Sequence, residues 1–358
     1  MKILFIGSRG SNHTKKWTDA FIERGHEVMV VCRKEEKQAS VVLNPKVKLH
    51  VMKYGGFSSY FLNIPELKRL YKEYKPDVVN VHYMAGYGLM ATLAGTRPLV
   101  LNCYGSDIFV APQNNKISRW VIKQILNSAD GVAATSIAMA TEAERIMGNK
   151  SKKVTVTPFG VDVKRFCPSE IKETHEQPVI TIVKYLQPIY DIELLIRAFS
   201  IAYDELATKP VLRIYGSGPL KDELVALSKE LGKEDSISFF DTIPNTQVPD
   251  VIRDCDIFVN CSKKESFGVT VVEGMACGKP VVVTDCPGPR EVVDDEITGI
   301  ILKDRQPRTM ADAFIRLINN PELRERMGIA GRKKVLEKYN WADNVQVLEN
   351  LYKEVVIK

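Results

Sequence analysis

A chain of 358 residues is long enough for about two domains of ordinary size. Hydrophobic residues make up 45% of it and charged residues 26%, which is the composition of an average soluble globular protein and excludes disordered, collagen-like and coiled-coil chains. Fifty basic and forty-four acidic residues give a formal net charge of +6. The basic clusters are short and mixed with acids, so we expect no extended nucleic-acid interface.

Seven cysteines are an odd number, and none of them forms a C-x-x-C pair or another metal-ligand spacing. We therefore expect reduced, mostly buried thiols, as in a cytosolic protein, and no metal or cofactor. The apolar stretch that begins at Ile3 is interrupted by Ser8 and Arg9, well short of a signal-peptide core or a membrane span. These features predict a protein on the cytoplasmic side of the membrane.

Short runs rich in β-branched residues alternate along the chain with longer amphipathic stretches, a pattern typical of βαβ units with mostly parallel strands. In the first half this pattern predicts helices at 14–24, 65–74 and 118–128, and strands at 3–7, 27–32, 48–52, 78–81, 99–103, 131–134 and 154–158. The polar stretch 169–178, with a Gly- and Pro-punctuated segment before it, is the predicted linker.

The second half repeats this alternation of predicted strands and helices. It predicts helices at 192–206, 219–231, 248–254, 268–277 and 308–319, and strands at 179–183, 211–215, 237–240, 257–259, 281–284 and 299–302. From Trp341 the apolar residues fall on one helical stripe. The fold class is therefore α/β, with two doubly wound parallel-sheet domains at 1–170 and 171–340 and a terminal helix at 341–358. Ligands of such sheets bind at the carboxyl ends of the strands, so we expect a cleft between the two domains.

The sharpest local pattern has Glu265 in the loop after a strand and Glu273 in the helix that starts near Gly268. Free amides at that helix start favour a diphosphate, and Gly268 lets a ligand approach the backbone. The two carboxylates would then bind sugar hydroxyls and ribose hydroxyls. In an equally weighted alternative, Glu265 caps the helix and Glu273 is a solvated surface residue.

These motifs extend over nearly the whole chain, and together the sequence resembles the retaining glycosyltransferases of family 4, whose hallmark is two Glu separated by seven residues. That resemblance implies the GT-B fold, with two Rossmann-like domains and a terminal helix that crosses back to the first domain. The matching segments are 25–28, 158–162 with Phe166, 216–220, 265–273, 275–285, 288–293 and 298–299.

The resemblance also implies roles for single residues. Glu273 would bind the ribose of a nucleotide-sugar donor, Glu265 the hexose, and residues 266–269 the sugar and diphosphate, while the base would lie near Ile243. In the first domain, the acceptor side, the loop 8–13 would face the donor phosphates. The individual donor-binding candidates are Ser266, Phe267, Gly268, Val269, Gly10, His13, Gly216, Ile243 and Glu273.

Two departures from the family pattern concern the reaction centre. The family's His-Gly before an acid corresponds here to Tyr104-Gly105-Ser106-Asp107, which makes Tyr104 and Asp107 candidates for the reaction centre. The family's Arg and Lys, which neutralise the leaving diphosphate, are absent from their positions. We predict that Lys184 replaces them, helped by the helix start at Gly268 and by Lys263 or Lys264. Alternatively, Lys184 points into solvent.

The expected activity is metal-independent transfer of a hexose from a UDP- or GDP-sugar to a hydroxyl acceptor, with retention inherited from the resemblance and a place in bacterial-type surface polysaccharide or glycolipid assembly. A sugar-nucleotide 2-epimerase and a non-catalytic nucleotide-sugar-binding protein are alternatives. The Asp254-x-Asp256 spacing of metal-dependent transferases is expected to be structural here. Basic residues beside apolar ones at 65–74 and 115–126 fit either a peripheral contact with a membrane that carries a lipid-linked acceptor or, as we expect more often, ordinary core faces.

Overall fold

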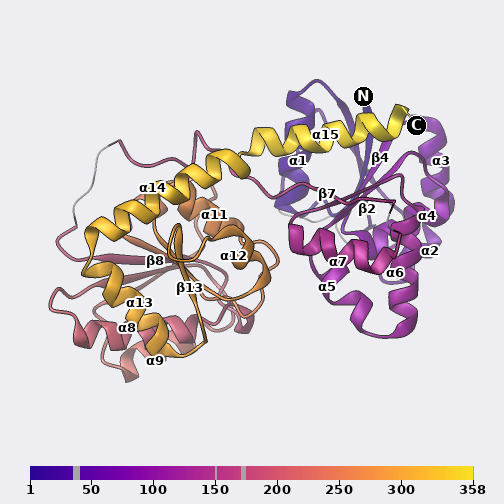
Figure 1. Ribbon diagram of the computed structural model, residues 1–358. Helices are drawn as coiled ribbons and strands as arrows, with labels where there is room; N and C mark the ends of the chain where they lie inside the picture. The colour runs from indigo at the N-terminus through magenta and orange to yellow at the C-terminus, as the bar shows by residue number, and fades with distance from the viewer. Residues whose placement is uncertain (35–40, 150, 171–174, 358) are drawn as a thin grey trace. The chain divides into compact units, whose positions relative to one another are not determined.

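The computed structural model describes residues 1–34, 41–149, 151–170 and 175–357. The chain forms two compact units, shown in Figure 1. Unit 1 comprises Met1–Pro158 and Asp343–Lys358, and unit 2 comprises Phe159–Ala342. Each unit is a parallel β-sheet with its own apolar core, as the alternation of short β-branched runs and amphipathic stretches predicts.

Unit 1 contains a seven-stranded sheet in the order β3-β2-β1-β4-β5-β6-β7. Its strands are β1 (Lys2–Ile6), β2 (Glu27–Cys32), β3 (Lys48–Val51), β4 (Val78–His82), β5 (Leu99–Cys103), β6 (Gly131–Ala134) and β7 (Thr155–Val156). Its helices are α1 (Asn12–Glu23), α2 (Ser59–Leu62), α3 (Ile64–Tyr74), η2 (Met84–Gly88), α4 (Leu89–Ala94), α5 (Ser106–Phe109), η3 (Ala111–Gln113), α6 (Lys116–Ser128) and α7 (Ile137–Met147).

Unit 2 contains a six-stranded sheet in the order β10-β9-β8-β11-β12-β13. Its strands are β8 (Val179–Val183), β9 (Val211–Tyr215), β10 (Ile237–Phe240), β11 (Ile257–Asn260), β12 (Val281–Thr284) and β13 (Gly299–Leu302). Its helices are η4 (Pro188–Tyr190), α8 (Ile192–Glu205), α9 (Lys221–Glu230), α10 (Val248–Arg253), α11 (Val269–Ala276), α12 (Pro287–Val292), α13 (Pro307–Ile318) and α14 (Pro321–Lys338).

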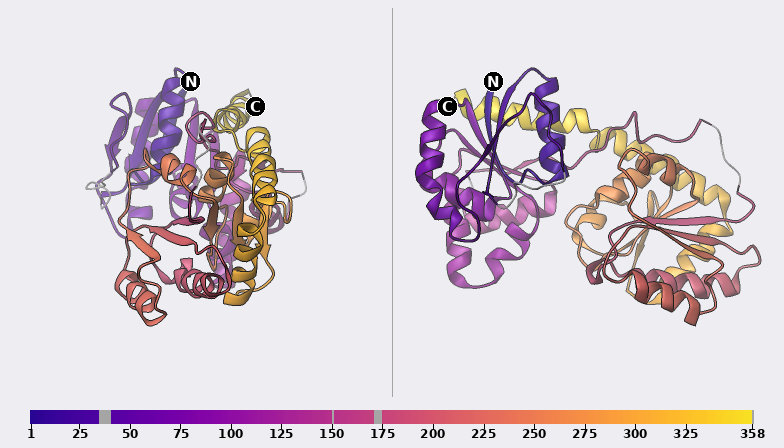
Figure 2. Two further views of the ribbon diagram at one scale, coloured as in Figure 1. Left: turned by 90° about the vertical axis from the view of Figure 1, so that its left-hand side faces the viewer. Right: turned by 180° about the vertical axis from the view of Figure 1, so that it is seen from behind.

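The terminal helix α15 (Trp341–Ile357) lies along unit 1, as Figures 1 and 2 show. Its Tyr352 ring is fully buried with its centroid 5.5 Å from that of Phe21 on α1. Glu349 accepts hydrogen bonds from Arg24 at 2.9 Å and pairs with His26 at 2.7 Å. Burial of Glu349 opposes ionisation, but these partners outweigh it and lower the pKa of its carboxyl. The predicted return of the last helix to the first domain is confirmed.

The boundary between the units lies after Pro158 rather than after residue 170. The segment 159–168 belongs to unit 2 because arginines of that unit bind its carbonyls: Arg332 donates to Phe166 at 2.7 Å and Arg253 to Cys167 at 2.9 Å. The backbone N–H of Val161 also donates to Tyr339 at 2.9 Å. Part of the predicted linker, residues 171–174, lies outside the described residues.

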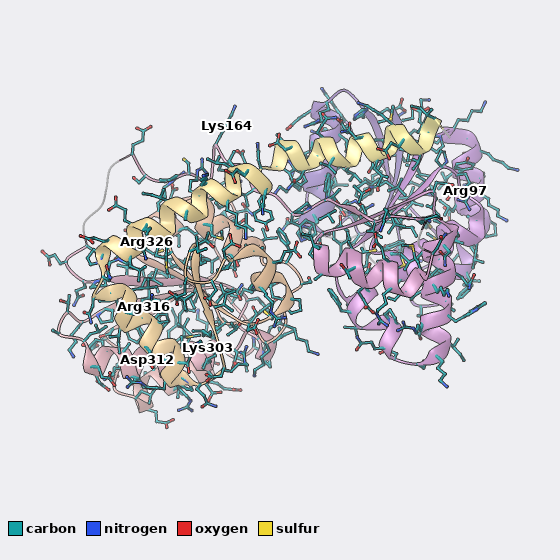
Figure 3. All side chains as sticks on the ribbon, viewed as in Figure 1. Arg97, Lys164, Lys303, Asp312, Arg316 and Arg326 are labelled. Atoms are coloured by element: carbon teal, nitrogen blue, oxygen red, sulfur yellow. The ribbon has the colours of Figure 1, made fainter. Side chains whose placement is uncertain are left out.

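The interiors are mainly apolar, and most charged side chains lie on the surface, with Asp107, Glu273, Lys334 and Glu349 among the buried exceptions. Side chains such as Arg97 in unit 1 and Arg326 in unit 2 lie on the outer surface in Figure 3. All seven cysteines are free thiols, six of them buried, as their number and spacing predicted. Among the described residues, no helix is both long and apolar enough to cross a bilayer.

Candidate functional site

The carboxyl ends of the strands of unit 2 bring together residues that are far apart in the sequence. Lys184 directly follows β8, Gly216 directly follows β9, and Glu265 lies in the loop after β11. The backbone N–H of Lys184 donates to Tyr215 at 2.9 Å, and a side chain on Gly216 would collide with the carbonyl of Lys184. This edge is where parallel α/β sheets bind ligands.

Lys184 and Glu265 form an ion pair. Nζ of Lys184 donates to Oε2 of Glu265 at 2.6 Å, and the two side chains are only 13% and 19% exposed. The same ammonium lies 4.6 Å from the ring centroid of Tyr190. Lys184 therefore does not point into solvent, and it places a positive charge at the loop that carries the first Glu of the motif.

A second charged group, which sequence reasoning missed, is centred on Arg305 in the segment after β13. Its guanidinium donates to the backbone carbonyls of Ser262 at 3.0 Å and Cys261 at 2.9 Å, and it pairs with Asp191. Asp191 also lies 3.3 Å from Nζ of Lys263. Arg305 therefore fixes the start of the loop that leads to Glu265. The residue offered no motif of its own in the sequence, only its position just after a predicted strand.

Helix α11 begins without a side-chain cap. Its N-cap residue Gly268 has a φ of 92°, in the left-handed region that glycine adopts without strain. Oε2 of Glu265 bonds to Lys184 rather than to the start of the helix. The first-turn N–H of Val271 already donates to the carbonyl of Gly268 at 2.9 Å, so the N–H groups of Val269 and Thr270 are the ones that a ligand would meet. Glu273 lies one turn further on and is only 8% exposed, so it is not a solvated surface residue.

The buried side chain of Phe267 anchors the loop between Glu265 and the start of α11. It is 2% exposed, and its ring centroid lies 5.9 Å from that of Phe159 and 5.7 Å from that of Tyr339. A side chain on Gly288 would lie 2.4 Å from the backbone nitrogen of Phe267, and the N–H of Gly288 donates to the carbonyl of Glu265 at 3.0 Å. The side chain of Phe267 is therefore not available to a ligand.

The predicted base-binding region lies at the ends of β9 and β10. Ile243 is partly exposed, and the neighbouring Thr242 bonds to Oγ of Ser217 through its own N–H at 3.3 Å and hydroxyl at 3.0 Å. The rings of Tyr215 and Phe240 stack with centroids 4.5 Å apart. These contacts order the two loops that flank Ile243.

In unit 1, the carboxyl edge of the sheet carries a group of neutral side chains. The hydroxyl of Tyr104, just after β5, bonds to Nδ1 of His82 at the end of β4, at 2.5 Å. The His13 ring stacks on Tyr104 with centroids 6.0 Å apart. Burial lowers the pKa of His82 well below its usual range and raises that of Tyr104 well above it, so both are uncharged near neutral pH. In the loop that follows β1, the N–H of Gly10 donates to Oγ of Ser8 at 3.2 Å.

Asp107, the other candidate from this segment, is bonded to the backbone around it. Its carboxylate is fully buried and accepts backbone N–H groups from Gly105 at 2.8 Å, Tyr104 at 3.1 Å and Met84 at 3.1 Å. Burial raises the pKa of this carboxyl, and these N–H groups partly offset the rise. Asp107 stays a candidate for the reaction centre, and both of its oxygens hold the turn after β5 against the start of η2.

The Asp254-x-Asp256 spacing is structural, as expected. Both carboxylates bond to His175, at 2.7 Å and 3.2 Å, and Arg213 also pairs with Asp254. Within the part of the chain that the structure describes, no three His, Cys, Asp or Glu side chains gather in a way that could hold a metal ion.

Comparison with known proteins agrees with this geometry. The family model "Glycosyl transferases group 1" matches residues 164–334, and "Glycosyl transferase 4-like" matches residues 2–136. The chain belongs to the family 4-like, group 1 glycosyltransferases. It is therefore a glycosyltransferase, and the family named from the sequence motifs is confirmed.

Two relatives and one solved structure illustrate its similarities. The transferase is 27% identical over 354 residues to N-acetyl-alpha-D-glucosaminyl L-malate synthase of Bacillus anthracis, covering 93% of this chain and 91% of that one. It is 28% identical over 298 residues to a GDP-mannose-dependent alpha-(1-6)-phosphatidylinositol monomannoside mannosyltransferase of Mycolicibacterium smegmatis, covering 77% and 76%. Anabaena Alr3699/HepE, solved with UDP and glucose, superimposes with a TM-score of 0.78 at 18% identity, covering 99% and 100%. The transferase has the GT-B fold, as the resemblance implied.

Proposed function

We propose that this glycosyltransferase moves a hexose from a UDP- or GDP-sugar to a hydroxyl acceptor, with retention of configuration and without a metal ion. The observation that carries the proposal is the carboxyl edge of unit 2. There Glu265 and Glu273 lie before and within a helix whose N-cap residue is Gly268, with cationic side chains beside the loop.

The two carboxylates divide the donor between them. Glu273, buried in α11, suits the ribose hydroxyls, because a buried carboxylate that accepts hydrogen bonds discriminates strongly for a ligand that donates them. Glu265, in the loop, suits the hexose hydroxyls. The proteins similar to this chain include one solved with UDP-glucose and a GDP-mannose-dependent enzyme, so both bases stay in the proposal. Ile243 and the loops beside it would meet the base.

The diphosphate needs fixed positive charge and oriented amides as the leaving group departs. In our proposal Lys184 supplies that charge in place of the family's Arg and Lys, and the start of α11 at Gly268 and Val269 supplies the amides. Its pair with Glu265 holds both side chains in one orientation before the donor arrives. Lys263, anchored on Asp191, adds a second cation.

The reaction would proceed by attack on the face from which the diphosphate leaves. The bond from the anomeric carbon to the phosphate oxygen breaks, a bond to the acceptor oxygen forms on the same face, and the acceptor proton passes to the departing phosphate oxygen. The protein then mainly orients the reactants and stabilises charge. Tyr104 and Asp107 act as positioning residues of unit 1, and the loop at Gly10 and His13 is assigned to the donor phosphates.

We assign the acceptor to bacterial-type surface polysaccharide or glycolipid assembly at the cytoplasmic side of the membrane. One relative is named for a phosphatidylinositol mannoside acceptor, which supports a lipid-linked acceptor for this enzyme as well. Such an acceptor would bring the enzyme to a membrane surface as a peripheral protein.

A thermal-shift screen of nucleoside diphosphates and nucleotide sugars tests the proposal, because a ligand that binds only the folded state raises the melting temperature. We expect stabilisation by UDP or GDP and their hexose conjugates, lost in Glu273→Ala. Incubation of the preferred nucleotide sugar without acceptor then distinguishes the activities. Formation of a 2-epimer from a UDP-N-acetylhexosamine would overturn the transferase mechanism in favour of an epimerase.

A further inference from the structure

The two basic-apolar helices that the sequence placed together behave differently in the structure. The apolar residues of α3, Leu67, Leu70 and Tyr74, are buried in the core of unit 1. On α6, by contrast, Ile117 is 75% exposed and Trp120 62% exposed, although Ile122, Ile125 and Leu126 of the same helix are buried. The outward face of α6 therefore carries two large exposed apolar side chains beside its polar ones, Lys116, Lys123, Gln124 and Asn127.

The exposed face is built around Trp120. At 100° per residue, Lys116 and Lys123 project within about 60° of Trp120 on one side and Ile117 projects on the other, while the buried residues point to the opposite side. Val110, 47% exposed, precedes η3, which packs against both α5 and α6. Figure 1 shows α5 and α6 in the same region of unit 1.

The charge on this face has a single sign. The segment from Ile108 to Ala129 contains Lys116, Arg119 and Lys123 and not one Asp or Glu. Among the described residues, no carboxylate forms an ion pair with any of these three cations. These three cations are therefore available to bind an external anion, and the apolar side chains beside them are available to an apolar phase.

We propose that this α6 surface, formed by Val110, Lys116, Ile117, Arg119, Trp120 and Lys123, binds the interface of an anionic lipid bilayer. Tryptophan favours the headgroup level of a membrane, and lysine and arginine extend their charged ends to anionic headgroups. A surface of this kind gives reversible peripheral binding without a spanning helix. The inference deepens the proposed function by naming the surface that would meet a lipid-linked acceptor, but it rests on the exposure and charge of α6 alone.

A second exposed apolar group, Phe57, Phe61 and Leu62 around α2, provides the comparison. Cations near that group are engaged by aromatic rings of the protein: Arg33 lies 4.8 Å from the centroid of Tyr60, and Lys53 lies 5.2 Å from that of Tyr54. Apolar exposure without available cations is a weaker match to an anionic surface, so we assign the membrane contact to α6.

Co-sedimentation of the full chain with lipid vesicles at low salt tests the assignment. We expect binding to vesicles that contain phosphatidylglycerol and none to pure phosphatidylcholine. K116Q/R119Q should weaken binding about 25-fold, at about fivefold per cation, and I117S/W120S at least about tenfold. The matched variant F57S/F61S should bind like the wild type.

Three results would overturn the inference. One is no binding of the wild type to anionic vesicles, and another is an equal loss in F57S/F61S. The third is a wild-type dimer in sedimentation velocity that I117S/W120S converts to a monomer, which would assign the face to a second copy of the chain. The cation variant changes only exposed or partly exposed polar side chains, so it stays informative if I117S/W120S folds poorly. Vesicle binding needs neither donor nor acceptor, so its outcome is independent of transfer activity.

Discussion

The carboxyl edges of the two sheets share a strand-loop-helix architecture but carry different side chains. In unit 2 the edge is charged: Lys184 forms an ion pair with Glu265, and both Lys263 and Arg305 form ion pairs with Asp191. At the ends of β4 and β5 in unit 1 the side chains are neutral or buried: His82 and Tyr104 bond to each other, and both oxygens of Asp107 accept backbone N–H groups, whereas a cation, Arg33, directly follows β2. In our proposal the diphosphate therefore meets fixed cations mainly in unit 2, while unit 1 adds the loop at Gly10 and His13 and the neutral side chains around Tyr104.

The largest expected effect is on the charged edge. Glu273→Gln keeps the size of the side chain but removes the charge that strengthens its hydrogen bonds to ribose, so transfer should fall on the order of a thousandfold. Steady-state kinetics with the preferred donor would measure it. A variant with kcat/KM within threefold of the wild type would show that the buried carboxylate is only structural.

The next effect concerns Lys184. Lys184→Ala should reduce kcat/KM for the donor on the order of a hundredfold, because the leaving diphosphate loses its fixed positive charge. Lys184→Arg should recover part of the loss, and Lys264→Ala is the matched control, since Lys264 is an exposed lysine of the same loop. Equal losses in the two alanine variants would mean that only the general positive charge matters.

On the neutral edge the expected effect is on stability. Asp107→Asn replaces one accepting oxygen by a donor that faces backbone N–H groups, which should lower the free energy of unfolding by about 2 kcal/mol. Donor affinity should change much less than in the Lys184 variants. Urea denaturation and donor titration measure the two quantities, and the reverse pattern would return Asp107 to the reaction centre.

The smallest expected effect is that of Tyr104→Phe. The phenol already bonds to His82, so its removal should change kcat less than about threefold and cost about 1 kcal/mol of stability through the unpaired imidazole nitrogen. Single-turnover kinetics would check this. A hundredfold loss of kcat at unchanged donor affinity would identify Tyr104 as a catalytic residue and break the comparison between the edges.

Much of the fold follows from local sequence. The strands at 27–32, 179–183, 211–215 and 281–284 have the predicted bounds because short runs that contain β-branched residues end abruptly at polar or glycine residues. Helix α14 was not predicted, because its inward face includes small residues such as Gly328, which packs against the carbonyl of Gly278 and gives no apolar stripe.

The sequence predicted most residues of the candidate site but not the contacts between them. The motif around Glu265 and Glu273 has fixed spacing, which a sequence displays directly. The pair of Lys184 with Glu265 joins residues 81 positions apart, and Arg305 reaches Asp191 across 114 positions. Such contacts depend on strand order, and the burial that turns Asp107 into a structural carboxylate depends on the packing of η2, so neither can be predicted from local patterns.

In our proposal Lys184 provides the positive charge that binds the diphosphate. Isothermal titration of the wild type and Lys184→Ala with the preferred nucleoside diphosphate and with the corresponding uncharged nucleoside tests it most directly. We expect Lys184→Ala to lose at least tenfold in affinity for the diphosphate and less than twofold in affinity for the nucleoside. An equal change for both ligands, or none for the diphosphate, would contradict it.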